Sequence, residues 1–330
     1  MRRGCWRGRN LSMCAIALFA LTVGSGRGQV AVDPELPEYR PVQGVSGNIK
    51  SVGSDTMNNL MTLWAEGFKR FYPNVGVEIE GKGSSTAPPA LIEGTATFGP
   101  MSRDMKASEI DEFEKKYGYK PAALSAALDV LAVYVQKDNP IGGLSLPQVD
   151  AIFSKTRRGG YPNDITTWGQ AGLSGPWANQ PISLYGRNTA SGTYGYFKEH
   201  ALFKGDFKDA VKEQPGSSSV VQGVGGDRFA IGYSGIGYKT EDVRAVPIAA
   251  AQGEPFYPPN DETAYDGTYP LARFLYLYVN ARPGRPLDPL RREFIRYVFS
   301  RQGQEDVVRD GYLPVTADLA AEAIGSLGIE

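Results

Sequence analysis

The chain has 330 residues, 42% of them hydrophobic, and contains 35 Lys and Arg against 36 Asp and Glu. Residues 1–28 hold five of the arginines and no acidic residue, so the rest of the chain has 30 basic and 36 acidic residues, a net charge of −6. This acidic balance argues against a nucleic-acid-binding protein, which usually has a basic surplus, and we expect no nucleic-acid partner.

A secretory signal peptide is predicted over residues 1–28. Four arginines precede an apolar run of 13 residues, Leu11–Val23. This run is shorter than the roughly 20 residues of a membrane span and typical of a signal peptide. The only cysteines, Cys5 and Cys14, lie in this segment, so the exported chain has neither a disulfide framework nor a cysteine metal site. Export of such a chain favours a bacterial periplasm or the exterior of the cell.

Residues 29–47 are rich in proline and polar residues and are predicted to form a flexible leader. The alternating run at 49–52 predicts a first strand. A helix is predicted over 55–71 because its apolar residues repeat on one helical face, with Ser54 or Asp55 as the expected N-cap. That face consists of Met57, Leu60, Met61, Trp64, Phe68 and Phe71.

The alternating residues 75–80 predict a second strand, and a short third strand is predicted at 97–99. Between them, residues 83–86 are expected to open a helix that continues through Ile92, with proline tolerated in its first turn. This alternation of strand, loop and helix indicates an α/β fold.

Two β-prone runs, 128–135 and 275–279, are predicted to cross between two lobes. We therefore predict a first lobe of residues 48–130 plus 270–330 and a second lobe of residues 131–269. The remaining elements expected are strands at 182–185 and 230–233 and helices at 288–301 and 303–309.

Three loops rich in Gly, Ser and Thr each follow a predicted strand and precede a predicted helix: residues 53–57, 81–86 and 187–194. The third contains Arg187 together with several hydroxyls and exposed backbone N–H groups. An oxyanion needs a forked cation for two of its oxygens and short neutral donors for the others. The three loops together indicate one shared anion site.

Each loop alone also has an ordinary structural explanation. Asp55 fits a plain helix N-cap, Ser84 and Ser85 fit a common helix start, and Arg187 fits a solvated surface arginine. Their joint occurrence at three junctions of strand and helix favours the shared site over these separate explanations.

The chain resembles the periplasmic phosphate-binding proteins, the substrate-binding components of phosphate ABC transporters. The resemblance rests on the segments Gly53–Met57, Gly83–Pro89, Phe98–Arg103, Gly186–Thr193 and Ile231–Ser234, in the order of that family. It implies a type II periplasmic-binding-protein fold, in which two lobes, each a mixed sheet flanked by helices, are joined by two crossing strands. It also implies a monomer in the periplasm, without cofactor, that passes inorganic phosphate to an inner-membrane ABC permease.

In that family, loops of both lobes surround a dehydrated phosphate. The resemblance implies hydroxyl donors at Thr56 and Ser84, a backbone N–H at the turn of residues 56–57, and the charged fork at Arg187. It further implies that the start of a second-lobe helix caps the anion. The full candidate set is Ser54, Asp55, Thr56, Met57, Ser84, Ser85, Ser102, Arg187, Ser191, Gly192 and Thr193.

Two positions depart from the family pattern. Gapless alignment puts Ser102 where members place a carboxylate, which accepts a hydrogen bond from protonated phosphate and repels sulfate. Thr189 stands where a carboxylate often braces the arginine. We expect Asp55, adjacent to Thr56, to replace the missing acceptor.

Other functions stay open at this level. The serine at position 102 leaves room for another tetrahedral oxyanion, such as sulfate or molybdate. An exported phosphate-handling enzyme, or a secreted scavenger without a permease, could use the same lobes. An enzyme would need a positioned nucleophile or a metal, but His200 is the only histidine and is expected well inside a helix as a surface or core residue. We therefore expect no catalytic residue and no metal ligand.

Overall fold

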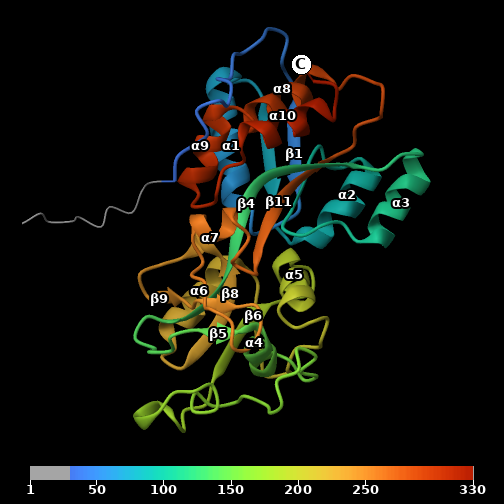
Figure 1. The fold of residues 1–330 in the computed structure, drawn as a ribbon. Coiled ribbons are helices and arrows are strands. Elements are labelled where there is room, and N and C mark those ends of the chain that lie inside the picture. Colours follow the sequence, from blue (N-terminus) through green and yellow to red (C-terminus); the bar gives the residue numbers. More distant parts are fainter. Residues whose placement is uncertain (1–29, 330) are drawn as a thin grey trace, which may run out of the picture.

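The computed structural model describes residues 30–329, and the predicted signal peptide at 1–28 lies outside them. Figure 1 shows two α/β lobes, one above the other, with the long strands β4 (Ala122–Gln136) and β11 (Ala272–Val279) between them. The predicted two-lobed fold with two crossing strands is confirmed. Within the described residues, no helix is both long enough and apolar enough to cross a membrane.

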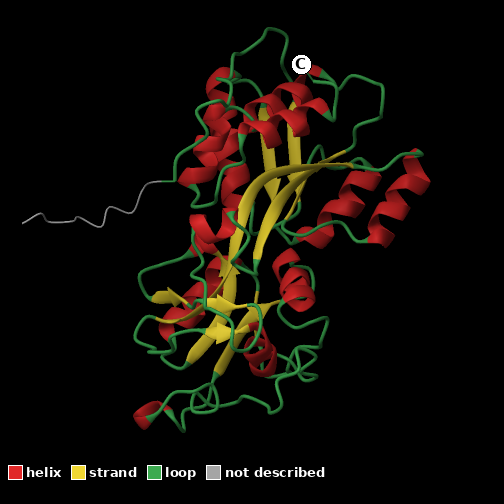
Figure 2. Ribbon diagram, in the orientation of Figure 1, coloured by secondary structure: helices red, strands yellow, loops and turns green. Residues whose placement is uncertain are grey.

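Helices lie outside the strands in both lobes (Figure 2). The upper, first lobe contains β1 (Asn48–Val52), α1 (Asn58–Phe71), β2 (Gly76–Glu80), η1 (Ser84–Thr86), α2 (Ala87–Glu93), β3 (Gly99–Met101), α3 (Ala107–Tyr117), α8 (Pro289–Val298), α9 (Arg301–Arg309) and α10 (Ala317–Gly325). The lower, second lobe contains β5 (Leu144–Ser145), α4 (Leu146–Phe153), η2 (Gly175–Trp177), β6 (Ser183–Arg187), α5 (Gly192–His200), β7 (Lys212–Gln214), α6 (Ser217–Gly226), β8 (Ala230–Gly235), η3 (Ile236–Tyr238), β9 (Val243–Ala245), β10 (Ile248–Ala249) and α7 (Asp261–Tyr265). The residues at which the lobes divide stay a prediction.

The main sheet has seven strands in the order β3-β11-β4-β8-β6-β7, with β9 also paired to β4. Strand β4 belongs to both lobes: residues 122–130 pair antiparallel with β11, and residues 131–135 pair antiparallel with β8. Two smaller parallel pairs, β1 with β2 and β5 with β10, complete the sheets. Because one strand runs through both lobes, a rotation of the lobes must bend the chain near Val130, where its partners change.

Helix α1 forms the centre of the first-lobe core, as its apolar repeat predicts. Leu60, Met61, Trp64 and Phe68 are fully buried. The indole Nε1 of Trp64 donates to the carbonyl of Gly303 at 2.8 Å, which ties α1 to α9. The polar atom of this large apolar side chain is thereby satisfied inside the core.

The start of α1 differs from the prediction. The helix begins at Asn58, Met57 occupies the N-cap position, and no side chain caps the helix. The expected N-cap at Ser54 or Asp55 is wrong, because both side chains make hydrogen bonds to other loops. The hydrogen bonds of these side chains to other loops take the place of the local bonds that would cap the helix.

Residues 30–47 also differ from the flexible leader that their composition predicts. They contain no helix or strand, but Leu36 and Tyr39 are buried in the first-lobe core. The hydroxyl of Tyr39 lies 2.8 Å from that of Tyr72 and donates to Glu293 at 3.1 Å. A few apolar and aromatic residues are enough to fix a short segment, and an average over its composition does not detect them.

The second-lobe core includes an aromatic stack that reaches the site described below. The rings of Phe197 and Tyr233 lie 3.9 Å apart at 6°, and Phe153 packs edge-on against both. The Tyr233 hydroxyl accepts a hydrogen bond from the backbone N–H of Arg187 at 3.2 Å. The core therefore fixes the end of β6, where Arg187 lies.

His200 is the last residue of α5 rather than an interior one. Its ring centroid lies 4.2 Å from that of Tyr196, and burial lowers the pKa of the imidazole. His200 is exposed and packs on Tyr196, as expected of a surface residue.

Asp310 lies after α9 with its Oδ2 buried and without a hydrogen-bond partner, and burial raises the pKa of this carboxyl to about 7. The folded state therefore keeps the proton to a higher pH than the unfolded chain. The free energy of unfolding must fall as the pH rises from about 4 to about 7 and stay low above that. We expect Asp310→Asn to raise the Tm by on the order of 2–6 °C at pH 8 and by less at pH 5.

Thermal unfolding followed by circular dichroism at the two pH values measures this difference. Asp111→Asn, at an exposed position of α3, is the control and should leave the Tm unchanged at both. An Asp310→Asn effect that is equal at pH 5 and pH 8 would contradict the assignment.

Candidate functional site

The first lobe contributes a group of buried hydroxyls from three loops. Ser54 donates to Ser102 Oγ at 3.0 Å, and Ser84 Oγ lies 3.3 Å from the same atom. All three side chains are at most 1% exposed. The loops are joined through their backbones, since Gly53 N donates to the carbonyl of Glu80 at 2.9 Å and Ser54 N donates to that of Pro100 at 2.8 Å.

Gly83 is needed at the entry to the second of these loops. Its φ is +119°, a value that residues with a side chain rarely adopt. A Cβ at this position would also lie 2.4 Å from the carbonyl oxygen of Ala190 in the second lobe. The glycine therefore allows Ser84 and Ser85 to approach the opposite lobe, where Ser85 N donates to the same carbonyl at 3.1 Å.

The second lobe contributes Arg187, which is 2% exposed at the end of β6. Its Nη1 donates to Ser217 Oγ at 2.8 Å, and its Nη2 donates to the carbonyl of Pro215 at 3.2 Å. Its Nε is buried and has no hydrogen-bond partner in the part of the chain that the structure describes. Burial lowers the pKa of the guanidinium, and the charge of Arg273 acts in the same direction. A buried cation with an unused donor is suited to an anion.

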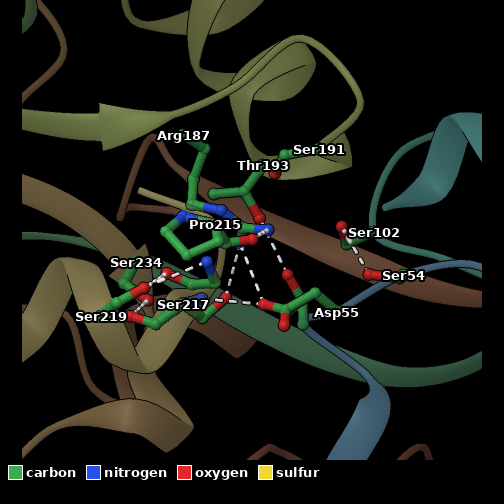
Figure 3. A network of polar contacts seen from close by, with 12 residues as sticks. Ser54, Asp55, Ser102, Arg187, Ser191, Thr193, Pro215, Ser217, Ser219 and Ser234 are labelled. Atoms are coloured by element: carbon green, nitrogen blue, oxygen red, sulfur yellow. Dashed lines mark hydrogen bonds and ion pairs between the residues drawn. The ribbon is translucent and has the colours of Figure 1, made fainter. Parts of the chain in front are cut away.

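Asp55 of the first lobe braces this arginine from the opposite lobe. Its Oδ2 lies 3.1 Å from Arg187 Nη1 and accepts from the backbone N–H of Ser217 at 2.8 Å. Figure 3 shows the carboxylate and the guanidinium pointing toward each other, with Ser217 beside them. The brace that the family pattern would place at Thr189 thus comes from the other lobe.

The start of α5 closes the site from the second lobe. Ser191 is the N-cap and accepts from the backbone N–H of Tyr194 at 3.3 Å. Gly192 packs so closely on the first lobe that a Cβ there would lie 2.2 Å from Ser84 Oγ and 2.6 Å from Ser102 Oγ. The positive end of the helix therefore faces the buried hydroxyls.

Further contacts join the two lobes directly. Thr56 Oγ1 and Thr193 Oγ1 lie 2.9 Å apart. The hydroxyl of Tyr238, from the second lobe, donates to the backbone carbonyl of Asp55 at 3.0 Å. Within the first lobe, the hydroxyl of Tyr312 donates to the carbonyl of Thr56 at 2.8 Å. These bonds hold the 53–57 loop against both lobes.

Most of the predicted residues come together, and the side chains of Met57 and Ser85 do not join the buried hydroxyls. The side chain of Met57 is fully buried in the first-lobe core, so only its backbone is available to a ligand. Ser85 Oγ accepts from Arg103 Nη2 at 3.3 Å. Ser102 is one of the three buried serines of the first lobe. The position at which the family pattern places a carboxylate is therefore part of the site, although a serine occupies it here.

Ser217 was missed by the sequence prediction, although a signal was present. It opens α6 directly after Gly216, in a run of three serines that has the same character as the three loops already identified. Arg273 and Asp129 were also missed. They lie on the crossing strands and form a buried ion pair, with Arg273 Nη2 2.8 Å from Asp129 Oδ2.

The chemistry of this cluster is that of a donor cage. It offers hydroxyls, backbone N–H groups at a helix start and one guanidinium, and each is a hydrogen-bond donor to an anion. Among residues 30–329, no group of His, Cys, Asp or Glu side chains is arranged to hold a metal ion. The arrangement suits the binding of a small oxyanion.

The sequence is similar to a known protein family and to proteins of known function. Residues 40–302 match the model of the PBP superfamily domain. The phosphate-binding protein PstS of Pseudomonas aeruginosa, in two strains, is 57% identical over 317 residues, which cover 96% of this chain and 98% of the relative. Protein SphX of Synechococcus elongatus is 28% identical over 84% of this chain and 81% of its own.

Solved structures of phosphate-binding proteins have a similar fold. A putative phosphate ABC transporter substrate-binding protein from Clostridium perfringens, determined with bound phosphate, superposes with a TM-score of 0.69 at 26% identity, over 82% of this chain and all of the other. An ABC-type phosphate transport receptor from Vibrio cholerae gives a TM-score of 0.63 at 23% identity, over 81% of this chain and all of its own, a likeness that shows the fold.

Proposed function

The chain belongs to the PBP superfamily and, within it, to the phosphate-binding proteins of ABC transporters, and we propose that its donor cage is a phosphate site between the lobes. The protein binds inorganic phosphate and delivers it to a membrane ABC permease. The observation that carries the proposal is the buried Arg187, which has an unused Nε donor and is held by Ser217 of the second lobe and Asp55 of the first.

In this proposal the phosphate receives hydrogen bonds from both lobes at once. Ser84, Ser102 and Thr56 donate from the first lobe, and Arg187 and the start of α5 donate from the second. Because water is excluded when the lobes meet, each of these bonds is stronger than on an open surface. The remaining predicted residues are Ser54, Asp55, Met57, Ser85, Ser191, Gly192 and Thr193, which support or complete the same cage.

The family is one of substrate-binding transport proteins, and we propose that the chain does no chemistry on its ligand. The donor cage supports this, because its serines and threonines are hydrogen-bonded to one another without a neighbouring histidine base. We further propose a monomer exported to the periplasm, since docking to a permease requires that both lobe tips be free.

Calorimetric titration of the exported chain with phosphate and, separately, with sulfate between pH 5 and pH 8.5 tests the proposal. Tight 1:1 binding of phosphate is the expected result. Equal binding of both anions would indicate a general oxyanion site, in line with the serine at position 102. The absence of a signal with either anion would overturn the proposed function.

The tight contact of Gly192 with the first lobe gives a separate prediction. In Gly192→Ala the added methyl group would overlap Ser84 Oγ and Ser102 Oγ, so the lobes could not come together around the anion. We expect the phosphate Kd to rise at least about tenfold, the loss of one or more charge-assisted hydrogen bonds. Calorimetry measures the change.

Gly195→Ala is the matched control, because it lies one turn later on α5. A Cβ there would approach only the side chain of Arg103, with Cδ at 3.3 Å and Nε at 3.7 Å, so a small shift of that side chain is enough. Its phosphate Kd should stay close to that of the unchanged protein. Equal Kd values for the two variants would refute a role for close contact at Gly192.

A further inference from the structure

Arg273 lies on the crossing strand β11 and donates to both lobes at once. Its Nη1 donates to the backbone carbonyl of Ser102 in the first lobe at 2.7 Å. Its Nη2 donates to Thr193 Oγ1 in the second lobe at 3.0 Å. The side chain is 2% exposed, so these bonds are shielded from water.

Asp129, on the crossing strand β4, holds this guanidinium in place. Its Oδ2 accepts from Arg273 Nε at 3.0 Å and from Nη2 at 2.8 Å. Its Oδ1 accepts from the backbone N–H of Ile236 at 3.2 Å. The carboxylate is fully buried, and the ring of Tyr196 covers the guanidinium at 5.2 Å. Four of the five N–H donors of the arginine are used in this planar arrangement, whereas a lysine could make only part of it.

The bonds from Arg273 also fix the direction of other hydrogen bonds in the cage. Because Thr193 Oγ1 accepts from Arg273, its own proton points away from the arginine, toward Thr56 or an anion. The carbonyl of Ser102 accepts from Arg273, and the N–H of the same residue donates to Ser84 Oγ at 3.0 Å. Ser84 Oγ accepts that bond and is left to donate its own proton.

We propose that Arg273, held by Asp129, is a positioning residue that couples closure of the lobes to the alignment of Ser102, Ser84 and Thr193 as donors. The inference rests on the proposed function, because the donors are those assigned to phosphate. Arg273 itself acts through these residues and has no contact with the ligand in this scheme. It draws the two lobes together at the strands on which they rotate.

Two variants test the proposal. Arg273→Met combined with Asp129→Asn removes the coupling without leaving a bare buried charge, and the asparagine can still accept from Ile236. Arg273→Lys keeps the charge opposite Asp129 but loses the fork. We expect the phosphate Kd to rise about tenfold to hundredfold in both, through faster dissociation, because two charge-assisted hydrogen bonds are lost. Stopped-flow measurement of the dissociation rate and calorimetry supply the readouts.

Arg244→Met is the matched control. This arginine also donates to two backbone carbonyls, those of Asn139 and Ile141, but within one lobe. It should leave both the Kd and the dissociation rate unchanged. Wild-type dissociation in Arg273→Lys, or an equal effect in the control, would overturn the proposal.

A second readout works without the ligand. The exported chain has no cysteine, so Glu112→Cys on α3 and Glu199→Cys on α5 can carry a fluorophore pair, one in each lobe. In ligand-free protein, labelled Arg273→Met with Asp129→Asn should show a longer mean distance between the labels, and a broader distribution of distances, than the labelled parent. If the parent fails to bind phosphate, the proposed function fails while this distance still decides the coupling. Identical distributions would refute the coupling even if phosphate binds.

Discussion

Replacing Arg187 by methionine is expected to raise the phosphate Kd by about a hundredfold or more. The guanidinium is buried, its Nε has no hydrogen-bond partner among residues 30–329, and Ser217, Pro215 and Asp55 fix its orientation. Truncating one partner of a buried, hydrogen-bonded charge pair costs about 2–5 kcal/mol or more, and each 1.4 kcal/mol is a factor of about ten in Kd. Isothermal titration with phosphate at neutral pH measures the change.

Part of that loss comes from Asp55, which would face the phosphate without its cation. The double variant Arg187→Met with Asp55→Asn removes this repulsion, so it should bind phosphate more tightly than Arg187→Met alone, though still far more weakly than the parent. Arg187→Lys should fall between, because a lysine keeps the charge but not the fork. A parental Kd in Arg187→Met would exclude the arginine from the site and with it the proposed cage.

The site could largely be predicted from the sequence because its donors occur in short local patterns. A loop of Gly, Ser and Thr between a strand and a helix has the same meaning wherever it occurs, and parallel strands bring such loops to one edge. The resemblance to a known family then predicted that the three loops surround one ligand. The same local signal, applied to Gly216 and the serines that follow it, would also have found Ser217.

What could not be predicted depends on pairs that lie far apart in the chain. Arg273 and Asp129 are separated by 144 residues, and nothing near either residue indicates the other. The misassigned N-cap has the same cause: a local preference predicted Asp55 to cap α1, whereas a carboxylate can gain more from Arg187, a charged partner in the other lobe. Local rules failed where the two lobes meet, which is also where the ligand is proposed to bind.

Asp55→Asn is expected to lower the preference for phosphate over sulfate by about a hundredfold, through opposite effects on the two anions. The two contacts to the carboxylate, from Arg187 and from Ser217 N, fall on Oδ2. We expect Oδ1 to accept the proton that phosphate carries at neutral pH and to repel sulfate, which carries none. Loss of such a charge-assisted hydrogen bond costs about 1.5–3 kcal/mol, or roughly tenfold to hundredfold in the phosphate Kd.

The asparagine is nearly isosteric, so its carbonyl can take the place of Oδ2 and keep Arg187 oriented while its amide donates to sulfate in place of Oδ1. Competition of sulfate against phosphate, measured by calorimetry, gives the ratio of the two affinities. Asp104→Asn, an exposed carboxylate two residues after Ser102, removes the same charge outside the cage and should leave the ratio unchanged. If Asp55→Asn also leaves the ratio unchanged, Asp55 only braces Arg187. It then does not replace the carboxylate that the family places at position 102. A lowered ratio in Asp55→Asn alone would mean that one side chain both orients the cation and selects the protonated anion, with the two roles divided between its two oxygens.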